Sequence, residues 1–175
     1  MKWKQTILPF FLLLTGLITD GFITSYFTSF LDSSLGLIIP RTVFLLIIIL
    51  SFHYKTKEMY FNVAIIGFMM DAFYVGFLGV YMATFIMLVA LVSSLRHVLN
   101  ANVLSYTLVS VLGLAASETL IYGIMRILSI TSISFQVFLA SRLGATLLFN
   151  AIIMLVFSYF IHLIVVNTLD ESENR

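Results

Sequence analysis

The chain has 175 residues, of which 61% are hydrophobic and only 10% are charged, and its net charge is +1. An ordinary soluble domain carries about 25% charged residues, so this composition excludes a soluble globular protein. The small net charge gives no electrostatic basis for nucleic-acid binding. The absence of cysteine excludes disulfides, thiolate nucleophiles and cysteine-based metal sites. We predict an all-α integral membrane protein.

Six apolar segments have close to the 20 or so residues that a helix needs to cross a bilayer. We predict six transmembrane helices at approximately residues 6–30, 35–52, 59–75, 77–95, 103–128 and 138–166. Pro40 falls in the first turns of the second segment, where proline is tolerated. Together these segments form one transmembrane domain over residues 1–169, followed by a polar cytoplasmic tail at 170–175. The first segment lacks a signal-peptide cleavage site, so we expect it to be retained.

The basic residues predict the orientation of these segments. With six spans, both termini lie on the same side of the membrane, and positive charge is enriched on the cytoplasmic side. The lysines all lie on the side of the termini, whereas three arginines lie near helix ends on the other side. The residues on the first side are Lys2, Lys4, Lys55, Lys57 and Arg96, and those on the second are Arg41, Arg126 and Arg142. We therefore predict that both termini are cytoplasmic.

A carboxylate, Asp71, lies within the apolar run of the third segment. A charge near the centre of a bilayer costs about 3 kcal/mol or more, so such a residue normally faces protein or water. Gly67 lies four residues earlier on the same helical face, where it would allow close approach of a neighbouring helix. We expect Asp71 to face the interior of the bundle, with Arg41 or Arg142 as its partner.

Small residues after Asp71 have two interpretations. If the helix continues, they form a stripe that can contact either a partner protein or the chain's own helices. If the helix breaks, Gly76 and Gly79 make the turn into the fourth segment. The stripe consists of Ala72, Gly76, Gly79 and Ala83.

The first segment repeats the pattern of the third. Gly16 and Asp20 in the first segment, and Gly67 and Asp71 in the third, both belong to the pattern Gly-x-x-x-Asp-small-Phe. The two helices are predicted to run in the same direction. The match is either a coincidence within a restricted alphabet or the trace of a duplicated hairpin with two similar sites.

Acids and arginines inside the predicted spans allow three interpretations. They form buried ion pairs that fix the register of the helices, or a polar pocket or contact with another protein, or a proton relay. Asn150 shares a face with Arg142, and we expect it to hydrogen-bond another helix. The acids are Asp20, Asp71 and Glu118, and the arginines are Arg41, Arg126 and Arg142.

The sequence contains no nucleophile with a neighbouring base, no phosphate-binding loop and no nucleotide-binding glycine motif, so we predict a protein that is not an enzyme. His53, His97 and His162 lie near the predicted cytoplasmic face, away from the acids. We therefore expect no metal site and no cofactor.

The stretch from Gly67 to Tyr81 resembles the bacterial rod shape-determining protein MreD family. It reads Gly-Phe-x-x-Asp and then Gly-x-x-Gly-x-Tyr, with Asp71, Gly76 and Gly79 at the marked positions. The chain length, six spans, short loops and Asn150 fit the same family. Between the two glycines, where the family often has a proline, this chain has Phe-Leu, which leaves the form of the turn open.

This resemblance implies a non-catalytic component of the cell-elongation machinery in the bacterial cytoplasmic membrane. Such a protein regulates cell shape and peptidoglycan synthesis by binding an MreC-like scaffold protein, near the RodA glycosyltransferase and its class B transpeptidase, within membrane lipid. The resemblance also implies a bundle like the substrate-binding subunits of energy-coupling-factor vitamin transporters. Candidate partner-binding residues are Gly67, Asp71, Gly76, Gly79, Tyr81, Asp20, Glu118, Arg41, Arg142 and Asn150.

Membership of that vitamin-transporter class is the alternative function. Its substrate-binding subunits usually carry an Ala-x-x-x-Ala docking motif in the first span, where this chain has Gly16 and Asp20 at the same spacing. A proton-coupled carrier is a third class, but no second repeat half supports it.

Overall fold

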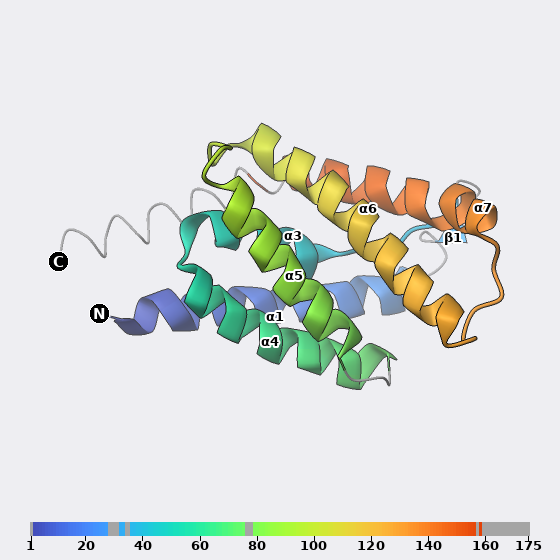
Figure 1. The fold of residues 1–175 in the computed structure, drawn as a ribbon, viewed down its shortest axis with the longest axis horizontal. Coiled ribbons are helices and arrows are strands. Elements are labelled where there is room, and N and C mark those ends of the chain that lie inside the picture. Colours follow the sequence, from blue (N-terminus) through green and yellow to red (C-terminus); the bar gives the residue numbers. More distant parts are fainter. Residues whose placement is uncertain (1, 28–31, 34–35, 76–78, 157, 159–175) are drawn as a thin grey trace.

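The computed structural model describes residues 2–27, 32–33, 36–75, 79–156 and 158. Within these residues, six helical segments follow one another in alternating directions (Figure 1), in agreement with the predicted number. The first five are α1 (Lys2–Tyr26), α3 (Thr42–His53), α4 (Thr56–Met70) with its π-helical continuation η1 (Asp71–Val75), α5 (Val80–Leu95) and α6 (Val103–Ile127). The sixth begins with α7 (Phe135–Phe138), continues through the π-helical turn η2 (Leu139–Leu143) and extends to Val156.

Three of these helices are long and apolar enough to cross a membrane, namely Ile7–Tyr26, Val103–Ile127 and Phe135–Val156. The apolar helices α3 and α5 are shorter, with 12 and 16 residues. At about 1.5 Å per residue, α3 spans only about 18 Å of a hydrocarbon core that is about 30 Å thick. The second segment therefore needs additional, non-helical chain to cover the depth of a bilayer.

The second segment differs from the predicted helix over 35–52, because α3 begins only at Thr42. Before it, the short strands β1 (Asp32–Ser33) and β2 (Gly36–Leu37) pair in antiparallel fashion, and residues 38–41 form neither helix nor strand. Pro40 thus precedes the helix instead of lying in its first turns. A proline disfavours helical geometry in the residue before it, which is Ile39 here, and this favours an extended entry into α3.

Other predicted bounds agree with the helices to within a few residues, as in the predicted 103–128 and the observed Val103–Ile127. Parts of four predicted spans, at 28–30, 35, 77–78, 157 and 159–166, lie outside the described residues. The predicted tail at 170–175 also lies outside them.

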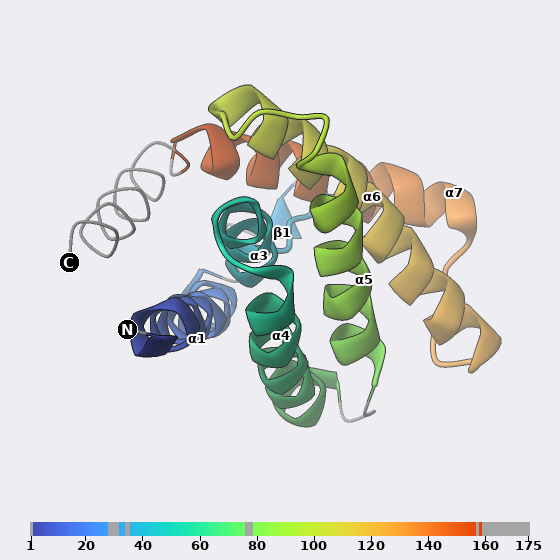
Figure 2. The ribbon, with the colours of Figure 1, turned by 60° about the vertical axis from the view of Figure 1, so that its left-hand side comes forward.

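The centre of the bundle is α3, which the other helices surround (Figure 2). Every residue from Val43 to Ser51 is buried, and α3 packs against α1, α4, α5 and α6. A helix that is apolar on all sides has no face that requires water, so it can be surrounded completely by other helices. The sequence of α3, from Val43 to Leu50, is wholly apolar, which is compatible with its central position.

Candidate functional site

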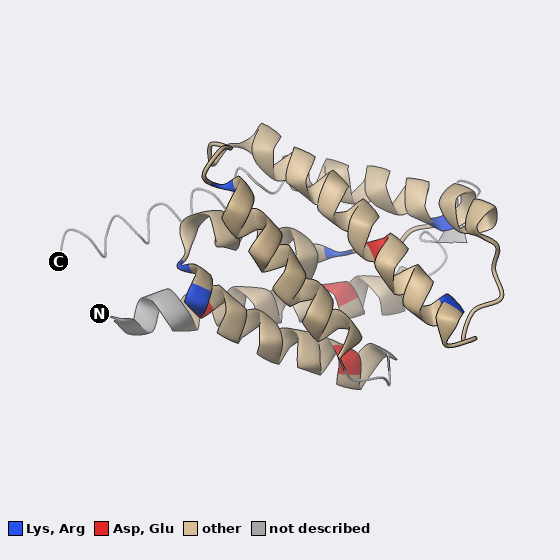
Figure 3. Ribbon diagram, viewed as in Figure 1, with Lys and Arg blue, Asp and Glu red and all other residues tan. Residues whose placement is uncertain are grey.

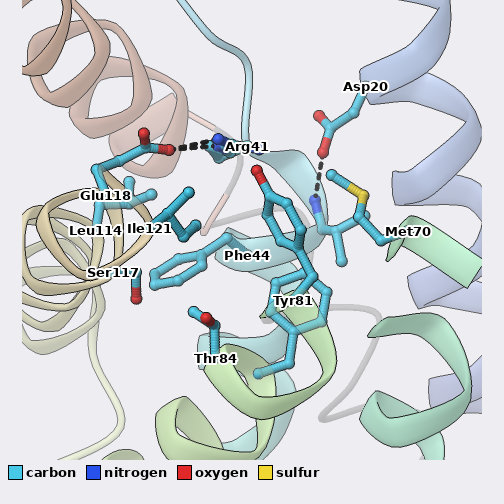
Figure 4. Close-up of a pocket in the computed structure, with 12 residues that line it drawn as sticks. Asp20, Arg41, Phe44, Met70, Tyr81, Thr84, Leu114, Ser117, Glu118 and Ile121 are labelled. Carbon is cyan, nitrogen blue, oxygen red and sulfur yellow. Dashed lines mark hydrogen bonds and ion pairs between the residues drawn. The ribbon is translucent and has the colours of Figure 1, made fainter. Parts of the chain in front are cut away.

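A buried ion-pair network joins three segments that are distant in the sequence. Glu118 of α6, which is 2% exposed, accepts a hydrogen bond from Nε of Arg41 at 2.7 Å and contacts Arg41 Nη2 at 2.5 Å. Its second carboxylate oxygen accepts a hydrogen bond from Nη2 of Arg142 in η2 at 3.1 Å. Figure 4 shows Arg41 between this carboxylate and the ring of Tyr81, whose centroid lies 5.2 Å from the guanidinium carbon. The ion-pair interpretation of Glu118 and these arginines is therefore confirmed.

The non-helical chain before α3 is held by side chains of the last helix. Asn150 donates to the carbonyl of Ile39 at 2.8 Å and accepts the backbone N–H of Arg41 at 2.9 Å. Thr146 accepts the N–H of Ile39 at 3.2 Å. Non-helical backbone at membrane depth is tolerated only where protein satisfies its polar groups. We expected Asn150 to hydrogen-bond another helix, and its amide bonds the chain that leads directly into α3, at Ile39 and at Arg41, the residue that precedes the first turn.

Asp20 of α1 caps the N-terminus of the neighbouring helix α3. Its carboxylate accepts the N–H groups of Thr42 at 2.7 Å and Val43 at 3.1 Å, and its side chain is 5% exposed. The first N–H groups of a helix have no partner within that helix, and the positive end of the helix dipole favours an anion there. Asp20 therefore stabilises the start of the central helix.

Asp71 caps α5 in the same way. It accepts the N–H groups of Gly79 at 2.8 Å, Tyr81 at 2.8 Å and Met82 at 3.2 Å, and it is 0% exposed. The prediction that Asp71 faces the interior is confirmed. The predicted pairing with Arg41 or Arg142 is wrong, because both arginines bind Glu118 and the described bonds of Asp71 come from backbone.

The repeated Gly-x-x-x-Asp pattern therefore has the same structural role twice. At Gly67 an added Cβ would lie 2.5 Å from the Cα of Met82, in the first turn of α5. At Gly16 it would lie 3.3 Å from the Cα of Val43, in the first turn of α3. Each glycine allows the next helix to approach, and the aspartate four residues later caps that helix. This shared role favours the duplicated-hairpin interpretation.

The helix that contains Asp71 does not continue into α5, as the second interpretation of the small residues requires. Gly79 has φ +106°, which an L side chain rarely adopts, and it immediately precedes α5. Ala72 and Ala83 are exposed on opposite sides of this break, so the predicted stripe does not lie on one helix. Gly76 lies outside the described residues.

Two residues that sequence reasoning did not include among the candidate site residues also contribute. Arg96 donates to the carbonyls of Ser51 at 3.2 Å and Tyr54 at 3.0 Å, so a cation stabilises the C-terminal end of α3. Thr146 is fully buried, and its position four residues from both Arg142 and Asn150 places it on the polar helix face that the sequence predicts. Both ends of the central helix are thus held by charged side chains.

The chemistry available to this network is limited by its packing. A cavity of about 10 Å³ lies among Asp20, Arg41, Tyr81 and Glu118, which is space for one water at most. Within the described residues, no group of three or more His, Asp or Glu side chains is placed to hold a metal ion. The packing around Arg41 and Glu118 holds chain segments in register and leaves no room for an organic substrate between these two side chains.

We expect Asp71→Leu to lower the amount of folded protein in the membrane, since three N–H groups at the start of α5 would lose their acceptor. Capping substitutions typically cost about 1 kcal/mol for one such contact, and a buried donor left unpaired costs about 1–3 kcal/mol. Asp71→Asn keeps one acceptor oxygen and should be milder. Membrane abundance and thermal unfolding in detergent measure both variants. Equal effects of leucine and asparagine would contradict the capping role.

Comparisons with known proteins agree with the sequence resemblance. A family model described as rod shape-determining protein MreD matches residues 4–166 of the chain. The rod shape-determining protein MreD of Bacillus subtilis (strain 168) is 30% identical over 155 residues, which covers 84% of this chain and 85% of that protein. No solved structure matches the chain. The expected likeness to vitamin-transporter subunits therefore gains no support.

Proposed function

Because the chain belongs to the MreD family, and is thus a cell shape-determining membrane protein, we propose that it acts by binding and not by catalysis. Its partner is an MreC-like scaffold protein in the elongation machinery of the bacterial cytoplasmic membrane, with RodA and a class B transpeptidase nearby. The buried acids and arginines are engaged in internal contacts, as described for Asp20, Asp71 and Glu118. The partner therefore meets the protein at its apolar, membrane-facing surface.

The observation that carries this proposal is a groove between α5 and α6, with a volume of about 270 Å³. The α6 side of the groove consists mainly of small residues, which let another helix approach closely and pack well within lipid. Leu88 and the exposed Leu91 of α5 form part of the facing wall. The small residues are Gly113, Ala116 and Ser117. A single membrane-spanning helix of an MreC-like partner is the occupant we propose.

The proposed orientation places both termini in the cytoplasm. Figure 3 shows blue ribbon segments at the end of the bundle where α1 begins, between α3 and the first turn of α4 and just after α5. These positions are Lys55, Lys57 and Arg96. Positive charge is enriched on the cytoplasmic side, so this end is the cytoplasmic one in our proposal.

We expect Ala116→Leu to reduce co-purification with an MreC-like partner while membrane abundance stays normal. Ala116 is exposed and lines the groove, so a leucine fills the space without entering the core. Ala90→Leu is the matched control, since Ala90 is exposed on α5 but does not line the groove. Equal co-purification of both variants and the natural protein would contradict the groove as the binding surface. Tight vitamin binding by the purified protein alone would support the transporter-subunit alternative.

A further inference from the structure

A second, larger cavity lies at the end of the bundle opposite the N-terminus. It has a volume of about 340 Å³ and is lined by residues of η1, α5, α6, the link that follows α6, and the α7–η2 segment. Volumes of about 300–1,000 Å³ are typical of ligand pockets. Much of its wall is apolar or aromatic, and the rings of Tyr122 and Phe138 stack with their centroids 4.4 Å apart. None of the described residues that line it is acidic.

The cavity contains one charged side chain, Arg142, whose pairing is incomplete. Glu118 is shared by two arginines and lies closer to Arg41, at 2.5 Å, than to Arg142, at 3.1 Å. The Nε of Arg142 is buried without a hydrogen-bond partner among the described residues, and the side chain as a whole is 33% exposed. The group formed by Glu118 and its two arginines carries one more positive than negative charge. Arg142 therefore retains donors and charge for a second anion.

A second cation lies near the same cavity. Arg126 donates to the carbonyls of Thr131 at 3.3 Å and Ile133 at 3.5 Å, and both of these residues line the cavity. Arginine binds phosphate well because its planar guanidinium can donate two parallel hydrogen bonds. A ligand with an anionic phosphate at the polar end and hydrocarbon along the aromatic wall matches this distribution of side chains.

The position of the cavity selects a lipid as the source of that phosphate. Its walls include the ends of Val103–Ile127 and Phe135–Val156, two helices that are long and apolar enough to cross a membrane. The ends of such helices lie at the level of lipid headgroups, where tyrosine side chains are also enriched. Tyr74, Tyr81 and Tyr122 line the cavity. We propose that this cavity binds an anionic phospholipid, with its phosphate on Arg142 and an acyl chain against the aromatic wall.

The test measures lipid retained by the purified full-length protein in native mass spectrometry, together with the shift in thermal unfolding temperature. The probes are phosphatidylglycerol, diacylglycerol with the same acyl chains, and inorganic phosphate. We expect retention of phosphatidylglycerol and a rise in unfolding temperature with it alone. Diacylglycerol has no phosphate, so it cannot accept the charged hydrogen bond from Arg142. Such a bond is worth about 1.5–3 kcal/mol, so retention of diacylglycerol should be at least about tenfold weaker. Equal retention of diacylglycerol, or an equal rise with inorganic phosphate, would overturn the proposal.

Variants locate the binding to this cavity. Arg142→Gln should abolish the preference for phosphatidylglycerol, and Arg142→Lys should keep much of it. Since Arg142→Gln also removes an ion pair to Glu118, Ser141→Leu provides an independent test that fills the cavity and leaves that pair intact. Its matched control is Ala140→Leu, at an exposed neighbour that does not line the cavity. Unchanged phosphatidylglycerol retention in Ser141→Leu would overturn the proposal even if Arg142→Gln does not fold.

Discussion

Glu118→Gln should be among the most damaging single substitutions in the bundle. The carboxylate is 2% exposed and is shared by Arg41, which is itself 7% exposed, and by Arg142. Glutamine has nearly the same shape but no charge, so Arg41 would become a buried cation without the carboxylate that pairs with it. Removing one partner of a buried ion pair costs about 3–5 kcal/mol. For a domain of this size, that corresponds to a fall of roughly 10 °C in the unfolding temperature.

Thermal unfolding in detergent and membrane abundance measure this effect. Glu58→Gln is the matched control, because it makes the same chemical change in a half-buried acid near the start of α4 that forms no ion pair with another of the described residues. The control should change the unfolding temperature little. If Glu118→Gln and Glu58→Gln shift it equally, the buried network contributes nothing specific to stability.

The outline of the fold could be predicted from hydropathy, but the second segment shows where that reasoning fails. Hydropathy places an apolar run at 35–52 and gives no sign that the residues before Thr42 are not helical. The helix start at Thr42 depends on Asn150 and Thr146, which are more than a hundred positions away in the chain and bond the backbone of Ile39 and Arg41. Pro40 was a local signal for a later start, because proline disfavours a helical residue before it.

The burial of Asp71 could be predicted, whereas its partners could not. Desolvation forces a carboxylate in an apolar run towards the interior, and this reasoning needs only the sequence. A carboxylate can be satisfied equally by an arginine or by the free N–H groups of a helix start. The choice depends on where the chain breaks, and the left-handed conformation of Gly79 sets the start of α5 beside Asp71. Because backbone N–H groups satisfy Asp71, Arg41 and Arg142 both pair with Glu118.

The two Gly-x-x-x-Asp units connect the sequence repeat to the energetics of the fold. In both units the glycine and the aspartate act on the same target, the first turn of the following helix. Close approach at Gly16 and Gly67 brings that turn within reach of Asp20 and Asp71. Displacing the helix by adding a side chain at the glycine would therefore also weaken the cap. The two glycines differ in what an added methyl group would meet, and this difference can be measured.

Gly67→Ala should destabilise the protein much more than Gly16→Ala. At Gly67 the added Cβ would lie 2.5 Å from the Cα and 2.9 Å from the N of Met82, and backbone atoms move only if α5 itself moves. At Gly16 the nearest atom is Leu46 Cδ1 at 2.6 Å, which a change of rotamer can displace, and the backbone of Val43 is 3.3 Å away. Overpacking of a well-packed core costs about 1–3 kcal/mol, and we expect the upper part of this range at Gly67.

Gly123→Ala calibrates the comparison, because an added Cβ at this position in α6 meets nothing within 4 Å. Alanine is favoured over glycine within a helix by about 0.5–1 kcal/mol, so this variant should be neutral or slightly stabilised. Unfolding temperatures in detergent should thus rank Gly123→Ala highest, Gly16→Ala next and Gly67→Ala lowest. If Gly67→Ala unfolds at the same temperature as Gly16→Ala, α5 is free to shift away from α4. The close approach at Gly67 would then not be what places the first turn of α5 on Asp71.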